Sequence, residues 1–324
     1  MLRFNPAKSF EFAGISRKKL SEYNPLKIRQ KGSKTKAIFA LGLVCFFWGT
    51  TWLASKEGVR YMPALQLAGI RQFIGGSVYV FWFIAKGRKL PRGREWGPVI
   101  VLSLLNFLLA NGLSTWGVKF ISAGLASIIG AIFPLWLVVI GLLVSKSRMS
   151  AMAIIGMVLG FGGICVIFIE HLSDFLNPNF TFGIVLSLIA TLAWAFGTLY
   201  TKKQAISFNP YFSLGLQMVI SGITLFTISS LNRGYISLFQ IPWQAWAAIS
   251  YLVIFGSLVS FIAYLYALQN LPTALTSIYA YINPVVAVIL GSLIFDEKLT
   301  VFIAIGGVTA IVGVYLVNRA YRVR

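Results

Sequence analysis

Residues 37–55 read AIFALGLVCFFWGTTWLAS, a run of 19 residues without a charged side chain. A helix over this run would be about 29 Å long, because each helical residue adds about 1.5 Å. The hydrocarbon core of a bilayer is about 30 Å thick, so the run predicts a membrane-spanning helix. A spanning β-strand would instead alternate apolar and polar residues over about ten positions, and this run is continuously apolar.

Further apolar runs of similar length follow along the chain. The ten runs cover residues 37–55, 64–85, 97–118, 123–144, 150–169, 180–200, 210–231, 243–268, 273–295 and 299–318. Of all 324 residues, 58% are hydrophobic and 11% are charged, whereas a soluble globular protein averages about 25% charged residues. Such a chain would expose large apolar patches in water. The sequence therefore predicts an all-α integral membrane protein with ten transmembrane helices.

The charges are few but strongly unbalanced, with 28 Lys and Arg against 8 Asp and Glu and a net charge of +20. If the N-terminus is cytoplasmic, 22 of the basic residues fall in cytoplasmic segments and 5 in outer loops, and Arg71 lies within a span. Because Lys and Arg in loops resist translocation, this bias predicts that both termini are cytoplasmic. The charge thus indicates orientation in the cell (inner) membrane, and we expect the lipid bilayer rather than a nucleic acid as the partner.

Residues 1–36 differ from the rest of the chain, with ten basic and two acidic residues. They contain no apolar stretch of the length a secretory signal peptide requires. We expect a disordered cytoplasmic tail. Contact with anionic lipid headgroups and a start site placed too far upstream are the alternatives. Residues 320–324 are expected to form a short cytoplasmic C-terminal tail.

The two halves of the chain align with each other. A shift of 150 residues superimposes the third to fifth runs on the eighth to tenth. A shift of 146 residues superimposes the first spans of the two halves. The matched pairs include Trp48 with Trp194, Ser127 with Ser277, Pro134 with Pro284, Gly156 with Gly306, and Gly163 with Gly313. We therefore predict two repeats, at 37–170 and 180–319. Because each has five spans, an odd number, the second must enter the membrane from the opposite side, as in many secondary transporters.

With these features the sequence resembles the EamA family of the drug/metabolite transporter superfamily. The residues that carry the resemblance are Trp48-Gly49, Lys56, Pro63, Arg71, the stretches 123–134 and 273–284, and Asp296-Glu297. The resemblance implies a ten-helix basket around a central cavity and transport of small metabolites, often export of amino acids or related compounds. The long basic N-terminal extension departs from the family pattern, as does Lys146-Ser147-Arg148 where the second repeat has Asp296-Glu297-Lys298.

Arg71 is the one basic residue well inside a predicted span, about 10 Å from its outer end. Ionisable groups at this depth are costly and usually face protein or a water-filled cavity. The planar guanidinium of Arg71 matches a carboxylate, which favours a role in substrate binding. The alternative is a structural arginine that binds helix-end carbonyls or extends toward the interface.

Uncharged polar and aromatic residues also lie within the runs and are candidates for the cavity wall. We expect the cavity-lining residues to be Trp48, Trp52, Arg71, Asn106, Asn111, Trp116, Tyr264, Tyr279 and Asn283. Pro134 and Pro284 are expected to break their helices near the middle of the membrane, because proline lacks the N–H that the helix needs. The alternative roles are helix–helix hydrogen bonding for the amides and interfacial anchoring for the aromatic residues.

No Asp or Glu lies in the middle of any run. Proton-coupled carriers often use a buried carboxylate as a relay, so we favour facilitated diffusion or exchange. We expect no enzyme activity, metal or cofactor, because paired carboxylates, a nucleophile–base pair and a metal cluster are lacking. The predicted function is secondary transport of small metabolites, with amino acid export first. The alternatives are a passive solute channel and a drug-efflux carrier for cations, and the oligomeric state is undetermined.

Overall fold

The computed structural model describes residues 33–133, 135–136, 139–140, 150–170, 172–204, 209–231, 235–271 and 279–322. Within them the chain forms helices and connecting loops. The helices of the first half are α2 (Lys34–Tyr61), α3 (Ala64–Ala85), α4 (Trp96–Leu102), η3 (Ser103–Gly112), α5 (Leu113–Gly117), α6 (Ala123–Gly130) and α8 (Ala151–Glu170). Those of the second half are α9 (Pro178–Gln204), α10 (Pro210–Ser230), α11 (Trp243–Tyr251), η6 (Leu252–Val259), α12 (Ser260–Asn270), α14 (Tyr279–Phe295) and α15 (Val301–Arg322). Three short 3₁₀ turns lie in the loops, at Gly93–Glu95, Asp174–Leu176 and Leu238–Gln240.

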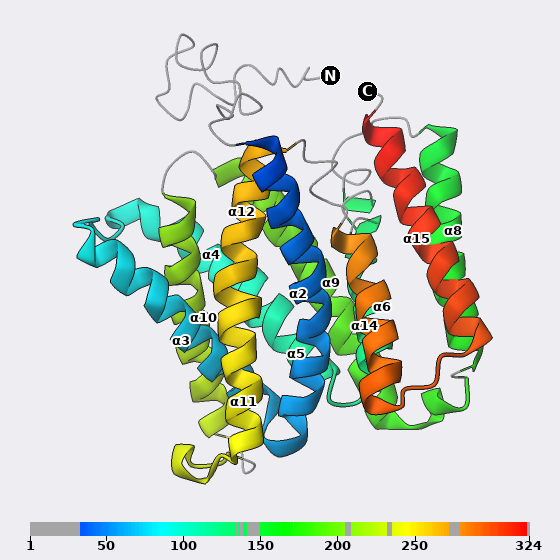
Figure 1. Ribbon diagram of the computed structural model, residues 1–324, viewed down its shortest axis with the longest axis horizontal. Helices are drawn as coiled ribbons and strands as arrows, with labels where there is room; N and C mark the ends of the chain where they lie inside the picture. The colour runs from blue at the N-terminus through cyan, green and yellow to red at the C-terminus, as the bar shows by residue number, and fades with distance from the viewer. Residues whose placement is uncertain are drawn as a thin grey trace, which may run out of the picture.

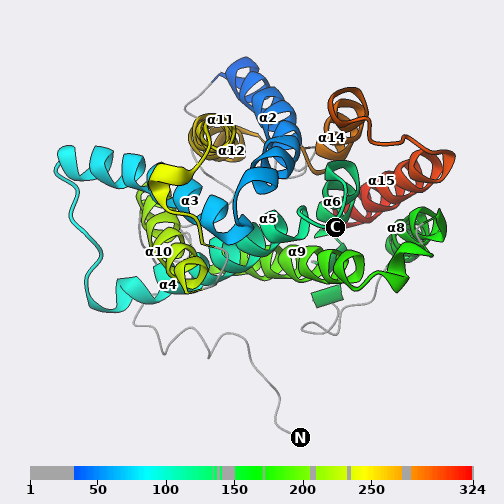
Figure 2. The ribbon, with the colours of Figure 1, turned by 90° about the horizontal axis from the view of Figure 1, so that it is seen from below.

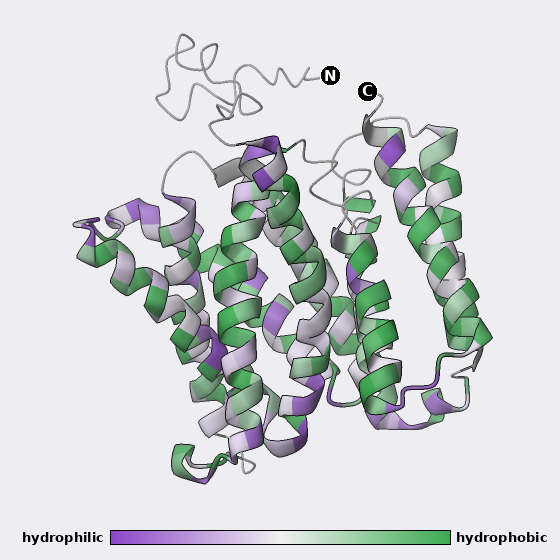
Figure 3. Cartoon of the chain, in the orientation of Figure 1, coloured by the Kyte–Doolittle hydropathy of each residue, from purple (hydrophilic) through white to green (hydrophobic). Residues whose placement is uncertain are grey.

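The helices follow the ten apolar runs. Seven helical segments of the described residues are long and apolar enough to cross a bilayer, and two shorter apolar helices cover Ile282–Phe295 and Val301–Val317. The remaining run, 123–144, begins as α6, and Pro134 lies outside the described residues. Figure 3 shows hydrophobic residues along most of the length of the helices and hydrophilic ones mainly near their ends. These findings confirm the predicted all-helical membrane class.

Large apolar side chains are exposed on the outside of the bundle. Phe81 is 77% exposed, Val158 is 67% exposed and Leu293 is 73% exposed. Exposed apolar surface of this extent is unfavourable in water and suits contact with lipid chains. The start of α2 and the end of α15 lie at the same end of the bundle (Figure 1), which we call the terminal end.

The third and the eighth of the ten spans, which are α4–η3–α5 and α11–η6–α12, share an unusual feature. Each contains a wide π-helical stretch in its middle, η3 over Ser103–Gly112 and η6 over Leu252–Val259. A π-turn shifts the hydrogen bonds to i→i+5 and often occurs at functional sites. The same deformation in the same helix of each half supports a common origin of the two halves.

The two halves pack through equivalent helices, α8 against α15 on one side of the bundle and α3 against α10 on the other (Figures 1 and 2). On α8, Gly156 faces Gly313 and Gly163 faces Gly306, with the backbones in close approach. The partner number falls as the α8 number rises, so these helices are antiparallel. Because Gly306 and Gly313 are the repeat mates of Gly156 and Gly163, the contact maps onto itself, as a two-fold axis requires.

The α3–α10 pair repeats this arrangement. Gly69 faces Gly222 on α10, and Gly76 faces Gly215. A shift of 146 residues takes Gly69 to Gly215 and Gly76 to Gly222, so this contact also maps onto itself. Equivalent helices that run in opposite directions are the structural signature of inverted repeats.

Candidate functional site

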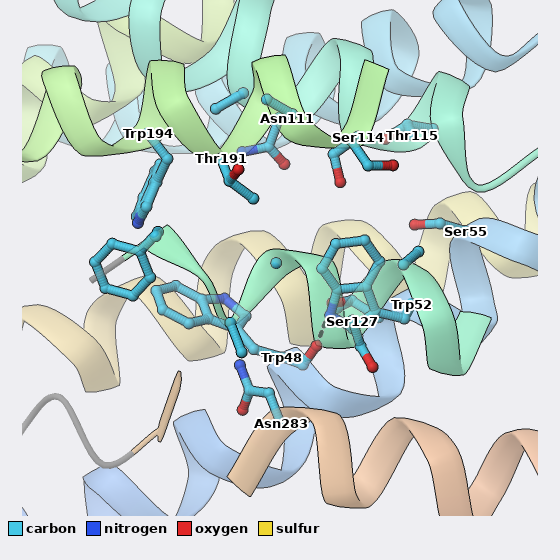
Figure 4. Close-up of a pocket in the computed structure, with 18 of the residues that line it drawn as sticks. Trp48, Trp52, Ser55, Asn111, Ser114, Thr115, Ser127, Thr191, Trp194 and Asn283 are labelled. Carbon is cyan, nitrogen blue, oxygen red and sulfur yellow. Dashed lines mark hydrogen bonds between the residues drawn. The ribbon is translucent and has the colours of Figure 1, made fainter. Parts of the chain in front are cut away.

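A pocket of about 180 Å³ lies in the middle of the bundle, between helices of both halves. Its polar wall consists of Thr51, Ser55, Arg71, Asn111, Ser114, Thr115, Ser127, Ser187, Thr191 and Asn283. Its aromatic wall consists of Trp48, Trp52, Phe133, Trp194, Phe261 and Tyr279, and small residues and Pro284 complete it. Figure 4 shows side chains from α2, α6, α9 and α14 around this space.

Helix α2 contributes one continuous face to the pocket. Trp48, Thr51, Trp52 and Ser55 all line it, and their i, i+3, i+4 and i+7 spacing places them on one side of a helix. The Thr51 hydroxyl donates to the Trp48 carbonyl oxygen at 2.7 Å, which satisfies that hydroxyl within the helix. Beside this face α2 approaches α14 closely, because a Cβ on Gly49 would lie 2.6 Å from Val286 Cβ.

An aromatic cluster packs around Trp48 on one wall of the pocket. The indole Nε1 of Trp48 donates to the Gly256 carbonyl oxygen at 3.2 Å. The Trp48 ring lies 5.2 Å from Phe261, 5.2 Å from Tyr264 and 5.0 Å from Tyr279, measured between centroids. Edge-to-face and tilted contacts at these distances are favourable for aromatic pairs. Trp48 therefore links α2, α12 and α14 in one packed layer.

Arg71 is the charged residue among the described side chains that line the pocket. It is 7% exposed, and its Nε donates to Ser257 Oγ at 3.2 Å. In the described part of the chain no carboxylate lies within salt-bridge distance of its guanidinium; the ion pair found there joins Arg60 and Glu57. Burying a cation without a counter-charge costs free energy. An anionic group bound beside Arg71 would offset this cost.

Most of the predicted site residues meet at this pocket. Those that line it are Trp48, Trp52, Arg71, Asn111, Tyr279, Asn283 and Pro284. With its amide nitrogen facing them, Asn283 donates to the carbonyl oxygens of Cys45 at 2.9 Å and Tyr279 at 3.0 Å, so it also joins α14 to α2. Helix α14 continues through Pro284 instead of breaking there; the missing N–H removes one hydrogen bond without ending the helix.

Three predicted residues lie away from the lining. Trp116 packs against Phe182, with ring centroids 5.2 Å apart. Tyr264 belongs to the aromatic layer, with its ring centroid 5.6 Å from that of Tyr279. The Asn106 Oδ1 atom is buried without a hydrogen-bond partner in the described residues. Each of these side chains is on a helix that contributes other residues to the pocket.

Several lining residues were absent from the predicted set. Trp194 is the repeat mate of Trp48, so the internal alignment contained the signal that would have found it. Ala126, Gly130 and Ala190 create the space by being small; Gly130 lets the Trp52 ring approach, since a Cβ there would lie 2.9 Å from that ring. No property of small residues in an apolar span distinguishes a pocket wall from a helix contact.

Glu297 links the two halves at the end of the bundle opposite the termini. Its two carboxylate oxygens accept hydrogen bonds from the backbone N–H of Ala123 at 2.7 Å and of Gly124 at 3.0 Å. These are unpaired donors of the first turn of α6, where a negative charge also interacts favourably with the helix dipole. A residue of the second repeat thus caps a pocket helix of the first.

Lys56 makes the complementary contact beside it. Its Nζ donates to the carbonyl oxygens of Val118 at 3.0 Å and Ile121 at 2.7 Å. These carbonyls follow the end of α5, where a cation is favourable. Lys56 and Glu297 together fix the turn between α5 and α6, and we call them the end clasp.

We expect the Glu297→Gln substitution to loosen the first turn of α6. The amide keeps the length of the side chain but loses the charge and one of the two acceptors, which costs about 1–2 kcal/mol. Hydrogen exchange at the Ala123 and Gly124 amides should accelerate, and the melting temperature should fall. The matched control is Asp296→Asn, because Asp296 has a φ of 53° that asparagine tolerates. Unchanged exchange in the Gln variant would contradict the capping role.

With this geometry in place, comparison with known proteins identifies the family. The model of the EamA-like transporter family matches residues 35–169 and 181–319. The chain belongs to the EamA-like transporter family. This membership makes it a multi-pass membrane transporter for small molecules, and not an enzyme.

Relatives of this EamA-like transporter occur in bacteria and plants. It is 30% identical to the uncharacterized inner membrane transporter YedA of Escherichia coli K12, over 85% of this chain and 87% of the relative. It is 27% identical to the uncharacterized transporter YvbV of Bacillus subtilis, over 88% of this chain and 92% of the relative. The chloroplastic WAT1-related protein At3g02690 of Arabidopsis thaliana is 28% identical over 84% of this chain and 67% of the relative.

A solved crystal structure has the same fold. It aligns with a TM-score of 0.64 over 90% of this chain and 100% of that chain, at 18% identity. At this identity the similarity concerns the arrangement of helices only.

Proposed function

We propose that this protein is a secondary transporter that moves small amphipathic solutes by alternating access between its two inverted repeats. Amino acids or related compounds are the proposed solutes, and export is the proposed direction. The observation that carries the proposal is the position of the pocket at the interface of the halves. Trp48 and Ser127 of the first repeat and Trp194 and Asn283 of the second all line it, as expected for a carrier built from inverted repeats.

The two-fold relation of the two halves around the pocket supports this mechanism. Ser55, Ser114 and Thr115 lie toward one end of the pocket, and Trp194 lies toward the other (Figure 4). Exchanging the conformations of two halves related by a two-fold axis would open the pocket alternately to the two ends of the bundle.

We further propose that both termini are cytoplasmic and that the protein resides in the cell (inner) membrane. The distribution of basic residues supports this orientation. In the same way we assign the two functional repeats to residues 37–170 and 180–319. The end clasp and the hydroxyl end of the pocket then face outward.

Flux through proteoliposomes tests the proposal. We expect uptake of a transported solute to saturate with concentration and to accelerate when the same solute is present inside the vesicles. The screen should include neutral and aromatic amino acids, organic acids and organic amines. Flux that rises linearly with concentration and ignores the internal solute would show a channel instead of a carrier.

A further inference from the structure

One end of the pocket, which we call the polar end, holds Arg71 and several hydroxyl side chains, and Trp194 lies toward the other end. Trp52 also lies at the polar end, and Thr191 lies beside Trp194 (Figure 4). Arg71 is seven residues from the start of α3, about 10 Å from the end of the bundle opposite the termini. Trp194 is sixteen residues from the start of α9, about 24 Å from the same end. In Figure 4, Ser55, Ser114 and Thr115 lie on one side of the pocket and Trp194 on the other.

The cation at the polar end is available to a ligand. A guanidinium carries five N–H donors, and the bond found for Arg71 in the described residues uses Nε alone, toward Ser257. Arg71 is 7% exposed and lines the pocket, so what remains of its surface meets the space a solute would occupy. Guanidinium groups bind carboxylates through two parallel hydrogen bonds.

The described lining holds no counter-charge for a cationic group. Its remaining polar side chains are hydroxyls, amides and indole N–H groups. An ammonium group near Arg71 would face a positive charge in a low-dielectric site without a carboxylate to offset it. This charge pattern distinguishes among solutes of the same shape.

We propose that this pocket selects net-anionic carboxylates with an apolar or aromatic body, ahead of zwitterions and of cations. The carboxylate binds Arg71 at the polar end, and the body lies against Trp48 and Trp194. The inference rests on the proposed transport function and narrows its substrate class. The zwitterionic amino acids expected from the sequence become weaker ligands than the corresponding acids without the amino group.

Three probes that share one phenylethyl body test the proposal. They are 3-phenylpropanoate, phenylalanine and phenethylamine, which carry net charges of −1, 0 and +1 on one phenylethyl body. Binding to the full chain in phosphatidylcholine nanodiscs is measured by calorimetry at pH 7. We expect 3-phenylpropanoate to bind at least tenfold more tightly than phenylalanine, and phenethylamine to bind most weakly. Phenylalanine or phenethylamine binding as tightly as 3-phenylpropanoate would overturn the proposal.

Variants assign the selectivity to Arg71. We expect Arg71→Gln to weaken the binding of 3-phenylpropanoate at least tenfold. Its binding of the neutral 3-phenylpropanol should stay within twofold of that of the parent protein. Arg60→Gln, an exposed arginine outside the pocket, should bind both probes like the parent. If Arg71→Gln does not fold, Arg71→Lys is the second variant. It keeps the charge, so it should bind the three probes in the same order as the parent protein. An Arg71→Gln variant with an intact ranking would overturn the proposal.

The outcome is separable from that of the flux experiment. Saturable, trans-accelerated flux with phenylalanine preferred would overturn the charge selectivity and leave the carrier function standing. Selective binding of 3-phenylpropanoate without saturable flux would overturn the carrier function and leave the site standing.

Discussion

Replacing Ala190 with phenylalanine is expected to reduce transport at least tenfold. Ala190 lines the pocket from α9 and is 3% exposed. Its methyl group leaves room that a benzyl group would occupy, so the solute and the new ring would compete for the same space. The measurement is initial uptake into proteoliposomes at matched amounts of folded protein.

The neighbouring residue provides a matched control. Ile189 is 43% exposed and is not among the lining residues, so Ile189→Phe changes a lipid-facing side chain of the same helix. We expect it to transport like the parent protein. Equal transport by the Ala190→Phe and Ile189→Phe proteins would show that solutes do not pass through this pocket.

The second large effect is expected from Gly163→Ala, which adds one methyl group between α8 and α15. A Cβ on Gly163 would lie 2.5 Å from the Gly306 carbonyl oxygen and would overlap the Ala310 backbone nitrogen. Neither backbone atom can rotate away, so the helices must separate. Overpacking of this kind costs about 1–3 kcal/mol, and we expect Gly163→Ala to lower the melting temperature of the purified protein.

Gly162 is the control for this substitution. A Cβ at Gly162 meets no atom within 4 Å, and alanine favours a helix by about 1 kcal/mol over glycine. Gly162→Ala should therefore leave the melting temperature unchanged or raise it. If Gly163→Ala is equally well tolerated, α8 and α15 do not pack as described, and the contact between the repeats loses its main support.

The fold could be predicted from the sequence because hydrophobicity dominates it. A run of about 20 apolar residues has one favourable structure in a membrane, and an odd number of spans per repeat forces the inversion. The π-helical stretches at Ser103–Gly112 and Leu252–Val259 could not be predicted. They depend on packing between neighbouring helices, for which no local signal exists.

The lining of the pocket could be predicted where spacing along one helix decides it, and not where a choice of helix face is needed. Trp48 and Trp52 share a face of α2 whichever neighbour it meets. Trp116 and Tyr264 lie on mostly apolar helices, where hydrophobic periodicity does not distinguish the side chains that face lipid, a neighbouring helix or the pocket. The internal repeat contains the signal for Trp194, which follows from Trp48 by symmetry.

Accessibility of position 114 from each face of the membrane tests alternating access most directly. Ser114→Cys is made in a chain whose own cysteines, Cys45 and Cys165, are replaced by alanine. Its reaction with an impermeant thiol reagent is then followed in vesicles of both orientations. We predict faster reaction from the face opposite the termini, reaction from the other face as well, and a ratio of the two rates that a transported solute shifts. Reaction from one face alone, whatever solute is present, would contradict alternating access.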